Sequence, residues 1–310
     1  MDILLMLPLA ILLDTAFGEP PNAFHPVAWI GKVISFFEKF GHNKRPAFQL
    51  VYGAIITLFV IILFTIPAYL LMSYLKDSGM IAYIIVGAIL LKLTFCLRGL
   101  RQAAYDMKKL LLADKLDDSR SELKVLASRD ASQLPKPLVV SGVVESVAES
   151  SCDSFIAPIF YFLIFGVPGA VAYRVANTFD SMIGYHGKYE YLGKFSARLD
   201  DVLNFIPARL TAIFIIIAAY LSKYNGKKAM KTAFRDHSNT ESPNAGWPMS
   251  AAAGALEIQF EKVDHYKLGN PDKPLLPETI DRSLGLMHST FANWVLACLI
   301  TGVIIVVASS

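Results

Sequence analysis

The sequence carries little charge: of its 310 residues only 18% are Asp, Glu, Lys or Arg, whereas 54% are hydrophobic. The mean hydropathy is +0.46. This balance is too apolar for an ordinary soluble domain, so it predicts an integral membrane protein. The net charge of +3 says little about partners, and the charged residues gather in a few polar stretches.

Other features are also missing, and each absence argues against a class of function. The three cysteines, Cys96, Cys152 and Cys298, lie far apart without a CxxC pair, so we expect no disulfide framework. No basic stripe with interleaved aromatic residues occurs, which argues against nucleic acid as a partner. Walker A, GxGxxG, HExxH and GxSxG motifs are absent, so no motif indicates nucleotide binding. The start, Met1-Asp2, lacks the basic residues of a signal peptide.

Long apolar runs predict the membrane-spanning helices. Residues 48–75 contain no charge, and residues 80–97 return after a tight turn, so the two are expected to form a helical hairpin. Residues 289–308 are predicted to form a final span. Three further segments are apolar but short or interrupted by Pro and Gly, and we expect them to be membrane-embedded or re-entrant. They are residues 3–17, 155–173 and 202–222.

Two polar regions lie between the apolar runs. Residues 98–154 are predicted to form amphipathic helices, and residues 223–288 are rich in predicted loops. Most Lys and Arg residues lie in these regions and in residues 14–47, so the positive-inside rule places all three in the cytoplasm. The predicted fold class is therefore all-α: a polytopic integral membrane protein, with cytoplasm-facing amphipathic helices and loops on a single membrane-embedded helical bundle.

One polar stretch, residues 173–209, stands between two strongly hydrophobic segments. Charges at a membrane boundary are costly and usually have a function. Its arginines could clamp a phosphate or carboxylate, and its carboxylates and amides could bind a metal or orient an amine. The alternative is that Arg–Asp pairs only neutralise each other. The candidate residues are Arg174, Asn177, Asp180, Ser181, Arg198, Asp200, Asp201, Asn204 and Arg209.

Three carboxylates, Glu145, Glu149 and Asp153, follow one another at intervals of four residues. On a continuous helix they would share one face. Such carboxylates repel one another unless a cation joins them, and hard oxygen ligands suit Mg²⁺, especially beside a phosphate-bearing substrate. The alternative interpretation is a solvated helix face.

Two smaller constellations complete the list of candidates. The loop 237–248 precedes a small-residue helix, Ser250–Leu256, whose N-terminus would favour an anion, unless the loop is a plain helix cap. Near the start of the chain, Asp14, Glu19 and His25 form a second cluster. His25 could be a general base or ligand, or simply a turn residue before proline.

Taken together, the motifs follow one another in a specific order along nearly the whole chain. The opening motif contains Asp14, Gly18–Pro21 and His25–Val27; the central one contains Tyr173–Arg174, Asn177–Thr178, Asp180–Met182, Ala197–Asp201, Asn204 and Pro207–Thr211; the late one is Ser242–Pro248. Arg129-Asp130 and the three spaced carboxylates also fit. This combination resembles the adenosylcobinamide-phosphate synthase family of cobalamin biosynthesis, the CbiB/CobD type.

The resemblance implies a reaction. The propionate carboxylate of adenosylcobyric acid would be joined in an amide bond to (R)-1-amino-2-propanol O-2-phosphate, or a related amino alcohol, giving adenosylcobinamide phosphate. ATP and Mg²⁺ are the implied energy source and metal. The implied surroundings are the lipid of the inner membrane and other membrane enzymes of late cobalamin assembly, with the active site facing the cytoplasm.

The resemblance also suggests roles for individual residues. The catalytic candidates are Asp180, Asp200, Asp201, Arg198 and His237. The substrate-binding candidates are Arg174, Asn177, Ser181, Asn204, Arg209, Asn244 and His25, and the metal ligands are Glu145, Glu149 and Asp153. Two other classes stay open: a non-catalytic membrane sensor or regulator on the same scaffold, and a corrinoid transporter with broken helices.

Overall fold

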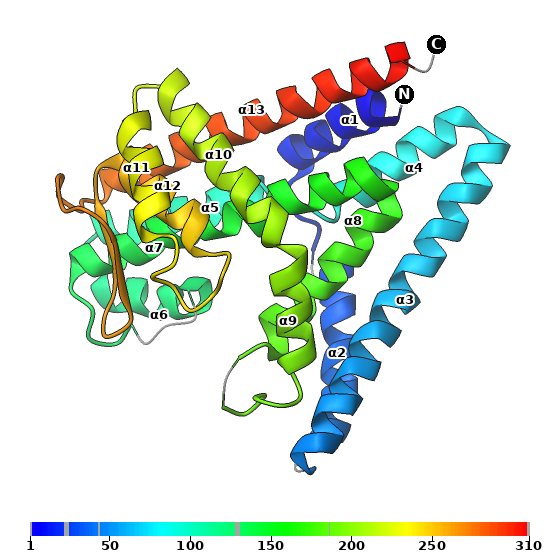
Figure 1. The fold of residues 1–310 in the computed structure, drawn as a ribbon, viewed down its shortest axis with the longest axis horizontal. Coiled ribbons are helices and arrows are strands. Elements are labelled where there is room, and N and C mark those ends of the chain that lie inside the picture. Colours follow the sequence, from blue (N-terminus) through cyan, green and yellow to red (C-terminus); the bar gives the residue numbers. More distant parts are fainter. Residues whose placement is uncertain (1, 22–24, 43, 128–130, 186, 309–310) are drawn as a thin grey trace. The chain divides into compact units, whose positions relative to one another are not determined.

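The computed structural model describes residues 2–21, 25–42, 44–127, 131–185 and 187–308 (Figure 1). The motif residues Arg129 and Asp130 lie outside these ranges. The regular secondary structure of the described residues consists of helices and one two-stranded hairpin, which confirms the all-α class. The contacts of the chain divide it into two compact units, and the single membrane-embedded domain stays a prediction. Unit 1 comprises residues 1–97, 157–204 and 298–310; unit 2 comprises residues 98–156 and 205–297.

Three helical stretches of the described chain are long and apolar enough to cross a membrane: α3 (Pro46–Ser78), Lys136–Ile183 and α13 (Glu278–Ala308). The predicted spans 48–75 and 289–308 fall within α3 and α13. A fourth candidate arises if α9 (Lys194–Leu203) and α10 (Phe205–Leu221) count as one broken span. The multiple apolar helices agree with a polytopic membrane protein.

The helix observed in the predicted span 80–97 is shorter than that span. Helix α4 (Met80–Lys92) has 13 residues, which cover about 20 Å, less than the ~30 Å of a bilayer core. It stops because the Thr94 hydroxyl donates to the Leu91 carbonyl (2.6 Å), while the carbonyl of Thr94 accepts from Arg174 (2.6 Å). Helix α1 (Asp2–Phe17) is a second short apolar helix, as expected for an embedded segment.

In unit 1, α8 (Ala157–Ile183) packs beside α3 and α2 (Pro26–Gly41) (Figure 1). Gly166, with φ +68°, breaks α8 within the predicted broken segment 155–173. The turn before α9 lies against α3, where a side chain on Gly53 would meet the Leu192 carbonyl at 2.0 Å. The buried residues that join these elements are Ile30, Ile34, Ile56, Val60, Val175, Phe179, Ile183 and Leu192.

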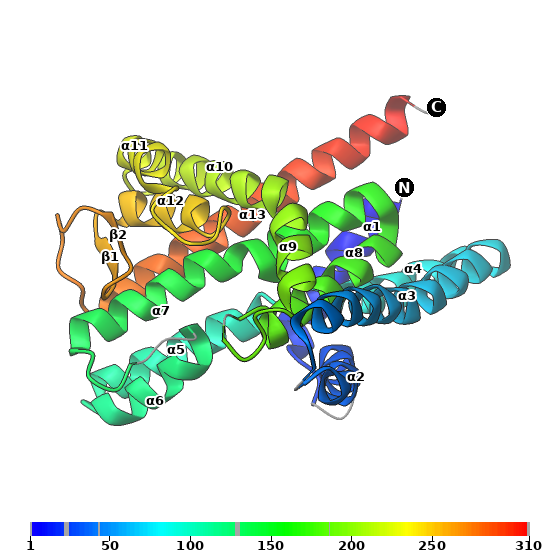
Figure 2. The same ribbon diagram turned by 60° about the horizontal axis from the view of Figure 1, so that its bottom comes forward.

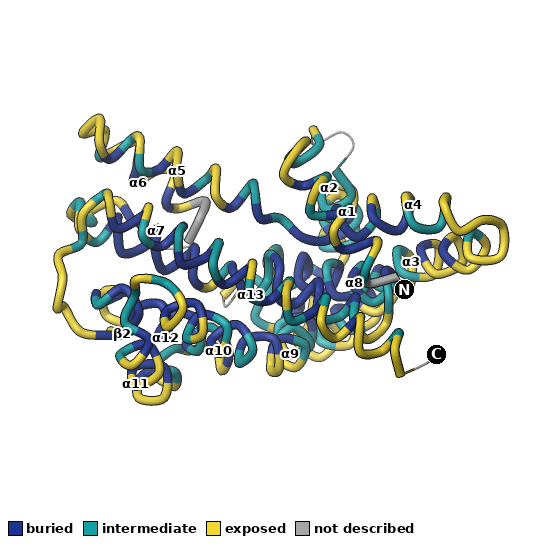
Figure 3. Tube along the Cα trace, turned by 90° about the horizontal axis from the view of Figure 1, so that it is seen from above, coloured by how far each residue is buried: buried dark blue, intermediate teal, exposed yellow. Residues whose placement is uncertain are grey.

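Unit 2 contains α7 (Lys136–Ser151), whose middle is buried. The continuous stretch of α7 from Val139 to Ala148 is buried (Figure 3), because most of its residues are Val, Ala, Ser or Gly, which allow close packing on all sides. The other elements include α5 (Arg98–Leu112), α6 (Leu116–Ala127), the π-helical turn η1 (Cys152–Ile156), α10 and most of α13.

The region 223–288 is more ordered than the sequence suggested. It contains α11 (Gly226–Asp236), α12 (Gly246–Leu256) and an antiparallel hairpin of β1 (Gln259–Lys262) and β2 (Tyr266–Gly269), in which Phe260 pairs with Leu268. Helices α11 and α12 lie side by side (Figures 1 and 2). They approach closely because Gly254 has no side chain; a Cβ there would lie 2.5 Å from the carbonyl oxygen of Lys228.

Candidate active site

The centre of the polar stretch in unit 1 is the carboxylate of Asp200 on α9. Asn177 of α8 donates to its Oδ1 (3.3 Å), and Asn204 donates to its Oδ2 (2.8 Å). Tyr173, one turn before Asn177 on α8, donates its hydroxyl to Asn204 Oδ1 (2.9 Å). Because Tyr173, Asn177 and Asn204 are buried, this network fixes Asp200 in one orientation.

Arg174 joins the same network from the other side. Its Nε donates to the Thr94 carbonyl (2.6 Å) and its Nη1 to Asn177 Oδ1 (3.2 Å). The Asn177 side chain therefore accepts from Arg174 with its oxygen and donates to Asp200 with its nitrogen. These two hydrogen bonds hold the guanidinium of Arg174 in one orientation. We call Tyr173, Arg174, Asn177, Asp200 and Asn204 the central cluster.

The other candidates of the stretch 173–209 lie differently. Arg198 pairs with Asp201 one turn along α9 (3.3 Å), and three-quarters of the Arg198 side chain is exposed, so this pair contributes little to stability. The Ser181 hydroxyl donates to the Asn177 carbonyl (2.9 Å). Asp180 lies beside Gly184 at the end of α8, where a Cβ on the glycine would meet Asp180 Oδ1 at 2.0 Å.

A second network in unit 1 surrounds Lys92, which was not among the predicted site residues. This nearly buried lysine donates to Glu19 (3.0 Å) and lies 3.8 Å from Asp14. Burial acts to raise the pKa of Glu19, but the hydrogen bond and charge of Lys92, with the hydrogen bond from His25, outweigh it and hold that pKa below its ordinary value. A lone charge inside an apolar segment was the signal that could have identified Lys92.

His25 is part of this second network. Its Nε2 lies 2.6 Å from Glu19, and its Nδ1 accepts from the backbone N–H of Val27 (3.2 Å), so it caps α2. Since Nδ1 accepts, Nε2 carries the proton and donates to Glu19. Both ring nitrogens therefore have partners within the protein, and substrate binding by His25 stays a prediction.

In unit 2, the three spaced carboxylates have three different environments. Glu145 is buried and accepts from the Tyr266 hydroxyl of β2 (2.6 Å), Glu149 is exposed, and Asp153 lies in η1. The π-helical turn alters the spacing on which the shared face depended. Among the described residues, no group of three His, Cys, Asp or Glu side chains is arranged to hold a metal ion.

These residues can nevertheless fit magnesium in a looser arrangement. Mg²⁺ usually takes one or two carboxylates and completes its shell with water and substrate phosphates. Glu149 and Asp153, which are the more accessible pair, could serve in this way. The magnesium site with Glu145, Glu149 and Asp153 stays a prediction.

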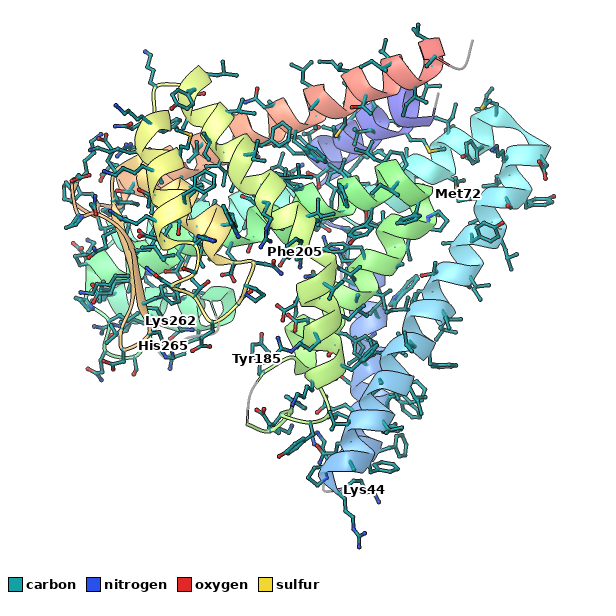
Figure 4. The ribbon with its side chains drawn as sticks, in the orientation of Figure 1. Lys44, Met72, Tyr185, Phe205, Lys262 and His265 are labelled. Atoms are coloured by element: carbon teal, nitrogen blue, oxygen red, sulfur yellow. The ribbon has the colours of Figure 1, made fainter. Side chains whose placement is uncertain are left out.

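Three predicted residues of unit 2 meet where α10, α11 and α12 come together; we call this place the α12 corner. Arg209 donates to the Asn244 side chain (3.2 Å) and to the Phe205 carbonyl (2.6 Å). Its guanidinium lies 3.6 Å from the ring centre of Phe205, labelled at the start of α10 in Figure 4, and 5.2 Å from that of Trp247. The His237 ring lies 3.9 Å from Trp247. The α12 corner thus combines a cation with three rings.

The helical fold, the long apolar helices and the polar clusters define the chain as an all-α polytopic membrane protein. A family model described as "CobD/Cbib protein" matches residues 7–287, and the chain therefore belongs to the CobD/Cbib family. No solved structure matches the chain.

Relatives cover almost the whole chain. "Cobalamin biosynthesis protein CobD" from Dehalococcoides mccartyi is 55% identical, over 96% of both chains. "Probable cobalamin biosynthesis protein CobD" from Methanothermobacter thermautotrophicus is 38% identical, over 97% of this chain and 98% of the relative. "Cobalamin biosynthesis protein CobD" from Citrobacter koseri is 35% identical, over 90% and 91%. The resemblance seen in the motifs is confirmed.

Proposed function

We propose that the chain is an adenosylcobinamide-phosphate synthase. It joins a propionate carboxylate of adenosylcobyric acid to the amine of (R)-1-amino-2-propanol O-2-phosphate, with ATP as the energy source. Membership of a family whose relatives are named for cobalamin biosynthesis supports the pathway. The observation that carries the chemistry is the central cluster, in which a buried hydrogen-bond network holds one arginine and one aspartate in fixed orientations.

The reaction needs an activated carboxylate. A carboxylate is a poor electrophile, and transfer of the terminal phosphoryl group of ATP to its oxygen creates an acyl phosphate and ADP. The amine then attacks the acyl carbon, the C–O bond to phosphate breaks, and the amine loses a proton. Mg²⁺, held through Glu149 and Asp153, would neutralise phosphate charge.

The chain's own residues have separate tasks in this proposal. Arg174, held by Asn177 and by the Thr94 carbonyl, binds anionic oxygens and stabilises the charge that develops on them. Asp200 already accepts from two amides, so it positions the network. Asp201, paired with the exposed Arg198, accepts the proton of the attacking amine.

The test is direct reconstitution. Protein in lipid nanodiscs is given adenosylcobyric acid, the amino alcohol phosphate, ATP and Mg²⁺, and products are followed by mass spectrometry. We expect adenosylcobinamide phosphate together with an equal amount of ADP, and neither product when ATP is omitted. Folded protein that binds the corrinoid but forms no product would favour the regulator. Corrinoid uptake into vesicles without amide formation would favour the transporter.

A further inference from the structure

In the part of the chain that the structure describes, the α12 corner holds several buried polar atoms that have no hydrogen-bond partner. Among the described residues, no partner lies within hydrogen-bonding distance of His237 Nδ1, Trp247 Nε1 or Ser250 Oγ. Ser250 is fully buried. Buried polar atoms in folded proteins almost always have partners, so a group of them in one place indicates a ligand or ordered water. The indole N–H is a donor only, and the other two atoms can donate.

Within the described part of the chain, Arg209 supplies a positive charge that no carboxylate balances. Its partners are the Phe205 carbonyl, the Asn244 side-chain oxygen and the rings of Phe205 and Trp247, all of them neutral. Across the described ranges, no Asp or Glu lies within ion-pair distance of its guanidinium. A half-buried arginine gains most from an anion that replaces the water it has lost.

The start of α12 brings these groups to one place. Gly246 lies against His237, whose carbonyl oxygen would be 2.0 Å from a Cβ on that glycine. Ser250 follows one turn later on the same face, and helix side chains tilt toward the N-terminus, so its hydroxyl leans toward Gly246. The N-terminal end of this 11-residue helix adds partial positive charge.

We propose that the α12 corner binds the phosphate group of a phosphate monoester. Arg209 supplies the charge, and His237, Trp247 and Ser250 supply neutral donors. A dianionic phosphate, with three terminal oxygens, suits several donors and one guanidinium better than a neutral hydroxyl does. The inference rests on the proposed function in one respect: the monoester is then the amino alcohol phosphate, and the corner distinguishes it from the unphosphorylated amino alcohol.

Binding measurements test the site without relying on catalysis. Calorimetry or ³¹P NMR on nanodisc protein would use four probes: inorganic phosphate, (R)-1-amino-2-propanol O-2-phosphate, the unphosphorylated amino alcohol and a non-hydrolysable ATP analogue. For Arg209→Gln we expect about tenfold or greater weakening for the first two, because a charged hydrogen bond is lost. Lys231→Gln removes an exposed charge from the neighbouring α11 and should change neither affinity.

A second variant covers the case in which Arg209→Gln folds poorly. Trp247→Phe keeps the ring beside His237 but removes the indole N–H, so phosphate should bind several-fold more weakly while the unfolding temperature changes little. Unchanged phosphate affinity in folded Arg209→Gln and Trp247→Phe would overturn the site. Weakening confined to the ATP analogue would overturn the assignment to a monoester.

The enzymatic readout separates this inference from the proposed function. Arg209→Gln should raise KM for the phosphorylated amino alcohol and leave KM for the unphosphorylated one unchanged. Phosphate binding that depends on Arg209, without any amide product, would refute the synthase and leave the phosphate site standing. Amide formation with the same KM in Arg209→Gln would refute the site and leave the synthase standing.

Discussion

At the scale of single residues, the neighbouring aspartates 200 and 201 differ because their surroundings differ. The carboxylate of Asp200 accepts from Asn177 and Asn204 and is fixed by them. The carboxylate of Asp201 pairs with Arg198, an exposed side chain on the same turn of α9. Two adjacent acids can therefore divide the work: one holds a network in place, and the other exchanges a proton with a substrate.

The proton-accepting role of Asp201 can be tested by Asp201→Asn. We expect kcat to fall about 10²- to 10⁴-fold with little change in KM for the corrinoid, because general-base catalysis typically contributes that much. Asp200→Asn is the matched variant. In addition to kcat, it should lower the unfolding temperature, because the amides of Asn177 and Asn204 lose their charged acceptor. Steady-state rates and thermal unfolding in nanodiscs measure both. If Asp201→Asn kept the wild-type kcat, another residue would have to be the general base.

The charge of Lys92 contributes to the stability of the fold. It is 5% exposed and lies between Asp14 and Glu19. Lys92→Met should therefore destabilise the protein by about 3 kcal/mol, because two carboxylates lose their buried counter-charge. Thermal unfolding measures the loss, and Lys76→Met, at an exposed position, should have no effect.

A compensating variant checks the cause of that effect. Adding Glu19→Gln to Lys92→Met removes one of the stranded carboxylates, so the double variant should be more stable than Lys92→Met alone. If the two substitutions simply added, the lysine would act through packing of its aliphatic chain and not through its charge.

At the scale of secondary-structure elements, Glu257 connects the end of α12 to α11 and to the segment that contains Lys273. It follows α12 with a left-handed backbone (φ 61°) and accepts from Lys228 of α11 (2.8 Å) and from Lys273. Hydrogen bonds from Lys228 and Lys273 lower the pKa of Glu257 from 4.5 to about 2. Because the pKa is lower in the folded protein, the stabilisation is complete above pH 4.5 and is lost as the pH falls toward 2.

This linkage gives a pH-dependent prediction. At neutral pH, Glu257→Gln should lower stability by about 1 kcal/mol, a modest value because nearly half of each lysine side chain is exposed to solvent. Between pH 4.5 and 2 the unfolding temperature of the wild type should fall more steeply than that of the variant. Parallel curves over this range would show that Glu257 does not control the acid sensitivity of unit 2.

The elements also show which features a sequence reveals. Uninterrupted apolar runs predicted α3 and α13, and Gly and Pro predicted the break in α8. The predicted end of α4 was wrong because the helix end depends on a contact between Thr94 and Arg174, which are 80 residues apart in sequence. Helix α12 was predicted too short, and α11 and the hairpin were missed, because long-range packing overrides local loop signals in residues 223–288.

The same distinction holds for the candidate site. Arg174 and Asn177 were both predicted as site residues because they lie in the polar stretch 173–209, and the structure joins them through a hydrogen bond. Spacing alone did not reveal that Asp153 lies in a π-helical turn, because that turn depends on the surrounding packing. Lys92 and its contacts with Asp14 and Glu19 likewise depend on separate helices coming together.

At the scale of the whole molecule, the predicted orientation in the membrane can be tested with residues at the two ends of α3. Helix α3 has 33 residues, about 50 Å, so its two ends can reach opposite sides of a ~30 Å core. Lys188 lies 3.5 Å from Glu38 of α2. Tyr52, near the start of α3, donates its hydroxyl to the carbonyl of Phe37, which is also in α2. The loop with Lys188 is therefore at the Pro46 end of α3, and Asp77 is at the other end.

The positive-inside rule predicts that Lys188 faces the cytoplasm and Asp77 the opposite side. In a Cys96→Ser background, with Cys152 and Cys298 buried, Lys188→Cys should react with an impermeant maleimide only in inverted vesicles. Asp77→Cys should react in intact cells. The reverse pattern would mean that the protein has the opposite orientation in the membrane. The central cluster would then have no access to the cytoplasmic ATP that the proposed reaction consumes. Equal labelling of both positions from one side would mean that α3 does not cross the membrane, although its length and composition allow it.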